Sequence, residues 1–442
     1  MWQDRRWLDM RAMGRCVSSL AAALLAAGLT GCIGGTSYNP PSFSPDGSTV
    51  VRLRTDAAVA GPDFEAPSFS AYNIFLDIFP AERPDEKRSV KVYSSLKDAL
   101  TISDVIFSPD SGKVAIVGHL RLLVVDLKTR EVREMARTKW NRLAADIISA
   151  AWAGNDEIRY AVSTSPIGWT PTDMREDWYK STLVLYRQAV MQSQDERKTI
   201  YEKVYEPPAK YTPGRPTVGW SPDGRYTLFA DPPETGPLTL LDARGGTRHA
   251  LSREMKSPWV IAWRPDGKAA LCYGIVRSAE PRCQWLMVHA HGRKVDDVSA
   301  QFNRLLPASL RDMAAWWTAD GQYVLVRGTG KDDARQYVLV QPQPWQVIRI
   351  GELLAGKVRL AKEEVPRFGD DLALQPLATC PAGGWLVAHA ADGKMYLTDY
   401  HARRVHEIAG PAVSPEGDRV ATYDRSTKSP RLEIRALKLP KE

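Results

Sequence analysis

The decapeptide WSPDGRYTLF, residues 220–229, places a turn between two runs of strand-forming residues. Pro222 presets φ for the second position of a type I turn, Asp223 suits the third, and Gly224 accepts the left-handed conformation that follows. The flanking runs PTVGW and RYTLFA therefore predict a β-hairpin. Two further runs, PLTLLDA and TRHAL, follow after short turns. The whole stretch predicts a unit of four short antiparallel strands.

The same unit recurs along the chain. Close copies begin at Phe43, Phe107, Trp263, Trp317 and Val413, and two weaker copies begin at Trp152 and Cys380, which makes eight units with the copy at Trp220. In the weaker copy at Trp152, we expect Asn155 to take the left-handed position. A sheet of four short strands cannot cover both of its faces. A repeat of such units therefore predicts neighbouring sheets packed radially, as in a β-propeller.

The predicted fold is all-β, a single β-propeller of eight four-stranded antiparallel blades over residues 41–442. The third strands, among them RLLVVDL and QYVLVQP, are nearly continuous apolar runs, as expected for strands covered on both faces. The last unit offers only three strands, so we expect a strand near Tyr38 to supply its fourth. The alternative is a ring of seven blades with one additional unit.

The repeated hairpin also resembles a known family. An aromatic-Ser-Pro-Asp-Gly turn followed by an apolar strand is similar to the repeat of TolB-type propellers, a WD-repeat-like family of the bacterial envelope. The resemblance covers almost the whole mature chain, and five copies follow the family pattern closely. It implies the propeller fold and leaves the function open, because TolB-like blades occur in scaffolds, in peptidase gating domains and in lipoproteins.

Repeated acids and histidines are the candidate catalytic or metal-binding residues. The acids are Asp46, Asp110, Asp223, Asp266 and Asp320. They could form a ring that binds cations, but turn chemistry explains all of them without a ligand. His289 and His291 alternate along one run and would need a third ligand elsewhere to hold a metal. The sequence contains no nucleophile elbow, phosphate loop or metalloprotease motif. We therefore expect no enzyme activity, no metal and no cofactor.

The amino-terminal residues predict export. An apolar run over residues 17–29 is too short to span a bilayer and is typical of a signal peptide, here residues 1–31. The following Leu29-Thr30-Gly31-Cys32 resembles the lipobox of bacterial lipoproteins. That resemblance implies a lipid-anchored Cys32 carrying acyl chains such as palmitate, with a short tether over residues 32–40. No aspartate follows Cys32, so the implied address is the periplasmic face of the outer membrane rather than the inner membrane.

Two further cysteines flank a loop of one unit. Cys272 and Cys283 lie on its second and third strands, at candidate facing positions of a hairpin. An oxidising periplasm would favour a disulfide between them, and the alternative is two buried thiols. The formal net charge of +7 comes from interspersed lysines, arginines and acids rather than a basic stripe. This pattern predicts a solvated surface and no nucleic-acid partner.

The longest insertions fall between second and third strands or between blades. The most informative one, residues 163–180, contains Trp169, Arg175, Trp178 and Tyr179. Aromatic residues with arginine in an exposed loop are typical of protein interfaces, although the rings could instead fold back over the blade end. We therefore predict a monomeric propeller that acts as a non-enzymatic scaffold for an envelope protein. The alternative is a propeller enzyme or carbohydrate-binding protein that acts on envelope glycans.

Overall fold

The computed structural model describes most of the chain between residues 34 and 437. The described residues are 34–59, 69–95, 101–138, 143–166, 181–205, 216–233, 236–252, 255–276, 282–306, 311–329, 335–349, 373–375, 385–389, 395–399, 401, 404–408, 410, 412–415, 418–424 and 431–437. Cys32 lies outside them, as do all four predicted interface residues of the 163–180 insertion: Trp169, Arg175, Trp178 and Tyr179.

The chain divides into two compact units. The smaller comprises residues 1–39, 53–76 and 91–99, and the larger comprises residues 40–52, 77–90 and 100–442. In the smaller unit, β1 (Gly34–Tyr38) pairs antiparallel with residues 54–58 of β3 (Thr49–Val59). The larger unit contains almost all of the described sheets.

We number the eight sheets in chain order, as sheet 1 to sheet 8. Sheet 1 contains β1, β2 (Ser42–Phe43), β3, β4 (Phe69–Pro80) and β5 (Arg88–Ser95). Sheet 2 contains β6 (Ile102–Phe107), β7 (Lys113–Gly118), β8 (Arg121–Asp126) and β9 (Val132–Arg137). Sheet 3 contains β10 (Leu143–Trp152), β11 (Glu157–Pro166), β12 (Ser181–Ala189) and β13 (Lys198–Tyr205). Sheet 4 contains β14 (Gly219–Trp220), β15 (Tyr226–Ala230), β16 (Leu238–Asp242) and β17 (Thr247–Ser252).

The remaining sheets repeat the pattern. Sheet 5 contains β18 (Met255–Trp263), β19 (Ala269–Val276), β20 (Arg282–His289) and β21 (Lys294–Asp297). Sheet 6 contains β22 (Arg311–Trp317), β23 (Val324–Thr329), β24 (Arg335–Pro342) and β25 (Trp345–Arg349). Sheet 7 contains β26 (Ala373–Gln375), β27 (Trp385–His389), β28 (Met395–Asp399) and β29 (Arg404–Ile408). Sheet 8 contains β30 (Ala412–Val413), β31 (Arg419–Asp424) and β32 (Arg431–Ala436).

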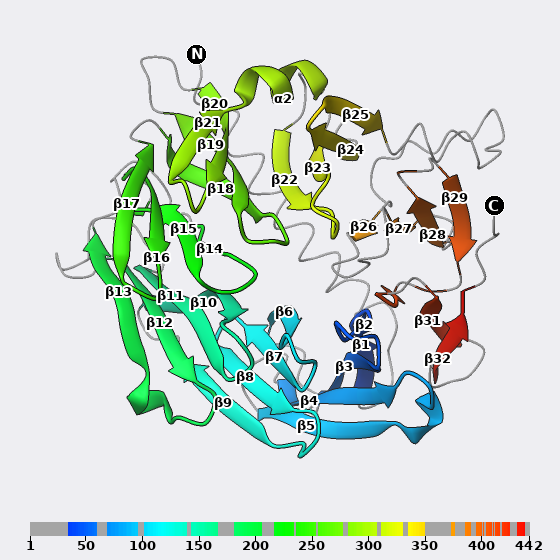
Figure 1. The fold of residues 1–442 in the computed structure, drawn as a ribbon. Helices are drawn as coiled ribbons and strands as arrows, with labels where there is room; N and C mark the ends of the chain where they lie inside the picture. The colour runs from blue at the N-terminus through cyan, green and yellow to red at the C-terminus, as the bar shows by residue number, and fades with distance from the viewer. Residues whose placement is uncertain are drawn as a thin grey trace, which may run out of the picture. The chain divides into compact units, whose positions relative to one another are not determined.

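Helical segments in the described residues are short. They are η1 (Pro84–Glu86), η3 (Gln194–Glu196) and α2 (Ser299–Leu305), which follows the last strand of sheet 5 (Figure 1). Among the described residues, no helix has the length and apolar character needed to cross a membrane.

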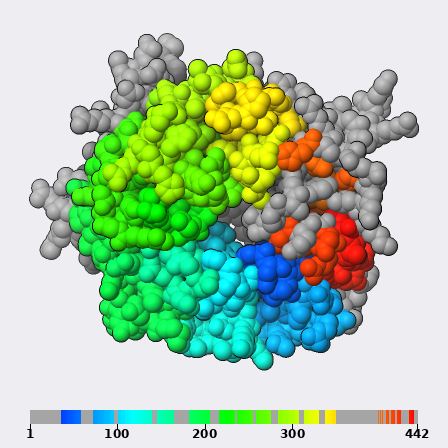
Figure 2. Space-filling model, in the orientation of Figure 1, coloured from blue at the N-terminus to red at the C-terminus, as the bar shows by residue number. Residues whose placement is uncertain are grey.

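Apolar clusters join successive sheets of the larger unit. One cluster buries Leu122 of sheet 2 with Ile158 of sheet 3, and the next buries Leu183 of sheet 3 with Phe229 of sheet 4. Two further clusters join sheet 4 to sheet 5 and sheet 5 to sheet 6. In Figure 2 the atoms of these sheets, coloured from cyan to yellow, adjoin one another along the face in view. From sheet 2 to sheet 6, each sheet therefore covers the face of the next one, which is the packing that a single four-stranded sheet lacks.

The same kind of contact joins the last sheet to the first. Phe43 and Phe79 of sheet 1 pack against Ala421 and Leu432 of sheet 8, and another cluster joins sheet 8 to sheet 7. All these residues belong to the larger unit. The eighth sheet is thus packed on both sides and is not a stray unit. The prediction of an all-β propeller of antiparallel blades is confirmed.

The predicted origin of the closing strand is wrong. Sheet 8 has three strands in the described part of the chain, and β1, which contains Tyr38, pairs with β3 of sheet 1. β2 pairs with the same strand at Val50 and Val51. Pro40 and Pro41 separate β1 from β2, and proline has no N–H to donate to the ladder. The first strand of sheet 1 is therefore interrupted but stays on one partner.

The turn of the opening decapeptide forms as predicted. Gly224 has φ +66° and its N–H donates to the Ser221 carbonyl oxygen at 2.8 Å. Ser221 Oγ donates to Asp223 Oδ1 at 2.6 Å, and the Arg225 N–H donates to the same oxygen at 3.0 Å. The aspartate carboxylate therefore closes its own turn.

The weaker copy at Trp152 departs from the prediction. Gly154 takes the left-handed conformation, with φ +80°, so the assignment of this position to Asn155 is wrong. Glycine has no Cβ and adopts positive φ at a lower steric cost than asparagine. The Asn155 side chain instead accepts a hydrogen bond from the Asp110 N–H of sheet 2 at 3.1 Å.

The repeated tryptophans tie neighbouring sheets together. Trp152 Nε1 of sheet 3 donates to the Ile106 carbonyl oxygen of sheet 2 at 3.0 Å. Equivalent bonds run from Trp263 to Gly219 at 2.9 Å and from Trp317 to Ala262 at 3.0 Å. In each case the acceptor immediately precedes the aromatic residue of the preceding copy. In these three copies the tryptophan thus supplies a directed bond between sheets as well as apolar area.

Candidate functional site

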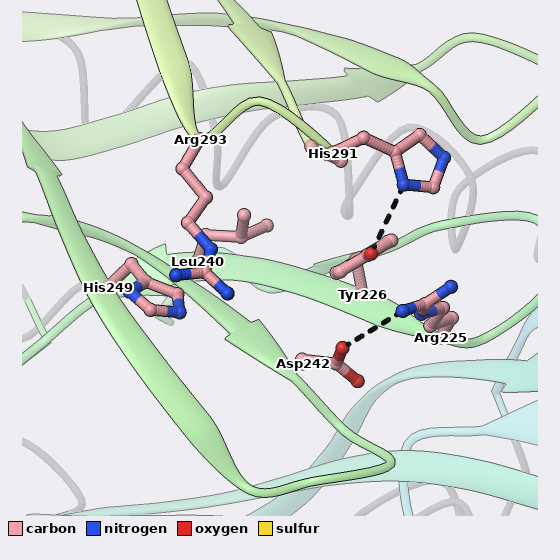
Figure 3. A pocket seen from close by; sticks show the side chains of 8 residues that line it. Arg225, Tyr226, Leu240, Asp242, His249, His291 and Arg293 are labelled. Atoms are coloured by element: carbon pink, nitrogen blue, oxygen red, sulfur yellow. Dashed lines mark hydrogen bonds and ion pairs between the residues drawn. The ribbon is translucent and has the colours of Figure 1, made fainter.

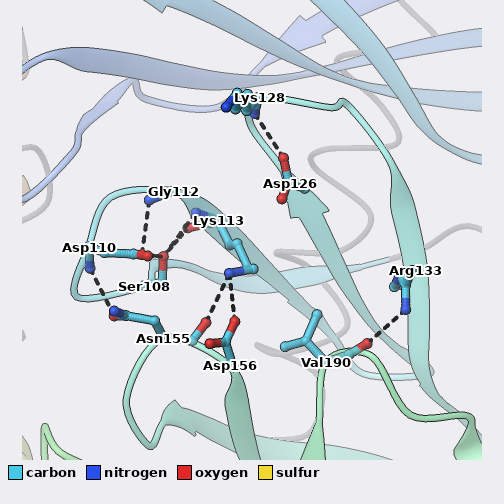
Figure 4. A network of polar contacts seen from close by, with 10 residues as sticks. All are labelled: Ser108, Asp110, Gly112, Lys113, Asp126, Lys128, Arg133, Asn155, Asp156 and Val190. Carbon is cyan, nitrogen blue, oxygen red and sulfur yellow. Dashed lines mark hydrogen bonds and ion pairs between the residues drawn. The ribbon is translucent and has the colours of Figure 1, made fainter.

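The repeated acids are engaged within their own turns. In Figure 4, Asp110 accepts hydrogen bonds from Ser108 Oγ at 2.6 Å and from the Gly112 N–H at 3.1 Å. The bond from Ser108 lowers the pKa of the Asp110 carboxyl. Lys113, in the same hairpin, reaches sheet 3 and pairs with Asp156 at 2.9 Å. The turn therefore serves hairpin closure and contact between sheets.

The other turn acids follow the same pattern. Asp46 accepts from Ser44 at 2.5 Å, Asp320 accepts from Thr318 at 2.5 Å, and Asp266 pairs with Arg264 at 2.6 Å. The described residues include no group of three or more His, Cys, Asp or Glu side chains placed to hold a metal ion. Each acid has a partner two residues before it in its own turn, so turn closure accounts for the recurrence of these acids.

The predicted facing positions of the two cysteines are wrong. In the β19–β20 ladder, Cys272 lies opposite Leu286 and Cys283 lies opposite Ile275. Cys283 shares a sheet face with Ile275, because directly opposed residues point to the same side. Residues 272 and 275 are an odd number apart, so the side chains of Cys272 and Cys283 lie on opposite faces of the sheet. Cys272 is buried in the cluster between sheets 4 and 5, Cys283 is exposed, and both are free thiols.

The two histidines of sheet 5 do not share a strand face. β20 ends at His289, whose Nε2 lies 3.1 Å from Asp296 Oδ2 across the hairpin. His291 lies in the following turn and contacts Tyr226 of sheet 4, with the Tyr226 hydroxyl 3.3 Å from His291 Nδ1. The two side chains therefore have separate partners.

His291 belongs to a pocket of about 190 Å³ between sheets 4 and 5. Its lining residues are Arg225, Tyr226, Leu240, Asp242, His249, Ala290, His291 and Arg293 (Figure 3). The first five come from β15, β16, β17 and the turn before β15, and the last three come from the β20–β21 turn. Most of the lining side chains are polar, and all of them lie in the larger unit.

Local folding places each of these groups. Arg225 follows the Ser-Pro-Asp-Gly turn directly, and its guanidinium carbon lies 4.8 Å from the centre of the Tyr226 ring. Asp242 ends β16, and its Oδ2 lies 3.4 Å from Arg225 Nη2. His249 is opposite Leu240 in the β16–β17 ladder. Figure 3 shows Arg293 and His249 at one side of the pocket, with the Arg225–Asp242 pair at the other.

The Tyr226–His291 contact has a counterpart elsewhere in the repeat. Their rings meet edge to face with centroids 5.7 Å apart, and the rings of Tyr323 and His401 do so at 5.4 Å between sheets 6 and 7. Sequence reasoning missed both pairs. The signal was present, because each tyrosine stands two residues after the turn glycine and each histidine is followed two residues later by arginine.

Comparisons with known proteins give only distant likenesses. No protein-family description matches the chain, and no curated protein matches it. Among solved structures, it is similar to an oligogalacturonate lyase from Vibrio parahaemolyticus, with 13% identity, 91% of this chain and 90% of that chain covered, and a TM-score of 0.46. It is also similar to an acylaminoacyl peptidase from Pyrococcus horikoshii, with 12% identity, 92% and 58% covered, and a TM-score of 0.47. With TM-scores under 0.5, no activity, substrate or partner is carried over from these proteins.

Proposed function

We propose that this chain is an exported lipoprotein with TolB-like repeats, whose β-propeller acts as a non-enzymatic binding module for an envelope protein. The acylated Cys32 anchors it at the periplasmic face of the outer membrane. The observation that best supports a non-enzymatic scaffold is that the repeated acids close their own turns. Asp46, Asp110, Asp223, Asp266 and Asp320 each accept a hydrogen bond from their own turn.

Rigid blades favour binding through the segments that join them. The larger unit is held by apolar clusters between sheets and by indole hydrogen bonds such as Trp263 to Gly219. In sheet 3, β11 ends at Pro166 and β12 begins at Ser181, so residues 167–180 join two strands of this scaffold. Binding residues commonly lie in segments that a rigid scaffold positions. Trp169, Arg175, Trp178 and Tyr179 supply the residue types of protein interfaces.

Crosslinking in intact bacterial cells tests the binding role. We expect the wild type to give a crosslinked species containing a second envelope protein. A Trp169→Ala/Trp178→Ala variant should lose it, because truncating aromatic anchors commonly costs about 2 kcal/mol or more of binding energy each. Trp259→Ala is the matched control, since Trp259 is 52% exposed and lies on β18, outside the 167–180 segment. Recovery of only the uncomplexed protein from all three strains would contradict the scaffold proposal.

Fractionation tests the anchor separately. Two or more acyl chains give stable membrane attachment, so the wild type should sediment with outer membranes. Cys32→Ser removes the acceptor thiol, and we expect that variant in the soluble fraction. An unmodified mature amino terminus in the mass spectrum of the wild type would contradict the lipid anchor.

A further inference from the structure

The charges of the pocket between sheets 4 and 5 are not required by the blade fold. Sheet 6 provides an internal comparison, because Tyr226 and Tyr323 each donate an N–H to the first residue of their turn. When these two tyrosines are taken as equivalent positions, the strand registers make Leu240 equivalent to Leu339. The same registers place Gln322, Gln341 and Ile348 where sheet 4 has Arg225, Asp242 and His249. Sheet 6 folds with two amides and an apolar residue at the three positions where sheet 4 has ionisable groups.

Several donors in the pocket have no acceptor. His249 Nε2 and Arg225 Nε are enclosed and have no hydrogen-bond partner among the described residues. Arg293 is exposed to solvent at the edge of the same pocket, and Figure 3 shows its guanidinium group beside His249. Enclosed polar groups are normally satisfied, so the two unpartnered nitrogens of Arg225 and His249 beside one space point to a missing hydrogen-bond partner.

We propose that this pocket binds a phosphoryl group, either as inorganic phosphate or as the phosphomonoester of a larger molecule. Arg225 and Arg293 present guanidinium donors, and guanidinium geometry matches phosphate oxygens. His249 adds an unpartnered imidazole nitrogen on the same side of the pocket as Arg293. The volume of about 190 Å³ is below the range of about 300–1,000 Å³ that suits drug-sized ligands, and it fits one compact anionic group.

The arrangement favours phosphate over carboxylate. One guanidinium group suffices for the two oxygens of a carboxylate, and Arg225 already has the carboxylate of Asp242 as its ion-pair partner. The remaining donors, Arg293 and His249, approach from the opposite side. A phosphoryl group has three terminal oxygens and carries more negative charge at neutral pH than a carboxylate. It can therefore use the donors on both sides at once.

Arg293 occupies a turn position that allows a matched experiment. It has φ +52° and is the last residue of its four-residue turn between paired strands, as is Arg130 with φ +65° in sheet 2. Gly246 holds the same position in sheet 4 with φ +68°. Glycine is thus compatible with this turn. Arg293→Gly removes a pocket side chain, and Arg130→Gly makes the same backbone change outside the pocket.

The test measures phosphate binding by calorimetry on the full-length protein in non-ionic detergent. We expect one phosphate per chain. We expect affinity about tenfold to a hundredfold lower in Arg293→Gly and in His249→Ile, because each removes a hydrogen bond to a charged group. Arg130→Gly should bind like the wild type. Both glycine variants should unfold at or above the wild-type temperature, because glycine adopts positive φ without the steric cost of a side chain.

Three further probes assign the source of the group. Stronger binding of glycerol phosphate, or of vesicles containing phosphatidic acid, than of inorganic phosphate would support a headgroup ligand, and the reverse order would support free phosphate. Acetate bound as tightly as phosphate would overturn the phosphoryl assignment. Absence of phosphate binding, or equal binding by the wild type, Arg293→Gly and Arg130→Gly, would overturn the site. These readouts do not depend on the envelope partner, so the two proposals can fail separately.

Discussion

Replacement of two turn glycines by alanine separates the conformational role of the repeat turn from its packing role. Gly224 and Gly246 have nearly the same φ, +66° and +68°. A Cβ on Gly224 would lie 2.7 Å from the Trp152 carbonyl oxygen of sheet 3, whereas a Cβ on Gly246 would meet nothing within 4 Å. Both substitutions carry the cost of a left-handed alanine, but only one of them forces two sheets apart.

The magnitudes follow from these two terms. A left-handed alanine costs roughly 1–2 kcal/mol, and the stiffer unfolded chain offsets about 0.4–1 kcal/mol of that, so Gly246→Ala should destabilise by about 1 kcal/mol. Gly224→Ala adds overpacking against a backbone atom, typically about 1–3 kcal/mol. We therefore expect Gly224→Ala to cost about 2–4 kcal/mol in total.

Urea unfolding followed by tryptophan fluorescence measures both changes. The midpoint for Gly224→Ala should lie well below that for Gly246→Ala, with similar denaturant slopes for the two variants. Equal midpoints would refute the close packing of the sheet 4 turn against the end of sheet 3. That packing is the contact by which repeated turns hold successive blades together.

Three further predictions concern single side chains. Trp263→Phe should destabilise the protein by about 1 kcal/mol more than Trp220→Phe, because the Trp263 indole donates to the preceding sheet at 2.9 Å whereas Trp220 Nε1 is buried without a partner in the described residues. Urea unfolding measures both free energies of unfolding, and a larger loss in Trp220→Phe would contradict this prediction. Asp110 has a lowered pKa, so its contribution to stability is present above its unfolded value near 4 and is lost as the pH falls through the folded value. Asp110→Asn should therefore be less stable than the wild type at pH 7, with the gap closing towards pH 2 in thermal scans, and a gap independent of pH would contradict this. Maleimide should label Cys283 in the native protein and Cys272 only after unfolding, because burial raises the pKa of the Cys272 thiol. Peptide mass spectrometry identifies the labelled cysteine, and labelling of Cys272 but not Cys283 in the native protein would contradict the register of β19 against β20.

Local chemistry made the turns and strands predictable. Proline and glycine restrict the backbone within a few residues, so Pro222 and Gly224 identify a turn wherever the chain goes afterwards. The apolar strands could likewise be recognised as covered on both faces, and the strand Leu238–Asp242 is buried along most of its length. These features depend on sequence neighbours alone.

Pairing across loops could not be predicted in the same way. The opposition of Cys272 to Leu286 depends on the register of β19 against β20, and a one-residue change in register reverses every side chain. The partner of the strand at Tyr38 depended on whether two prolines end a strand or only interrupt it. Neither outcome is a property of a short sequence window.

The pocket was harder to predict from the sequence than the strand pairing, because its residues come from two sheets. They are separated by up to 68 positions, from Arg225 to Arg293. Arg225, His249 and Arg293 each look like ordinary surface residues when read alone. Only the packing of sheet 4 on sheet 5 brings them together. A comparison of equivalent repeat positions would have shown the unusual charges of sheet 4, although not that they share one space.

Anomalous scattering from crystals grown with Mn²⁺ tests the structural role of the repeated acids most directly. The acids concerned are Asp46, Asp110, Asp223, Asp266 and Asp320. Because each carboxylate is held by donors of its own turn, we predict no anomalous peak at coordination distance from any of them. A manganese peak shared by two or more of these carboxylates would contradict the conclusion that they close turns, and would point instead to an ion-binding centre.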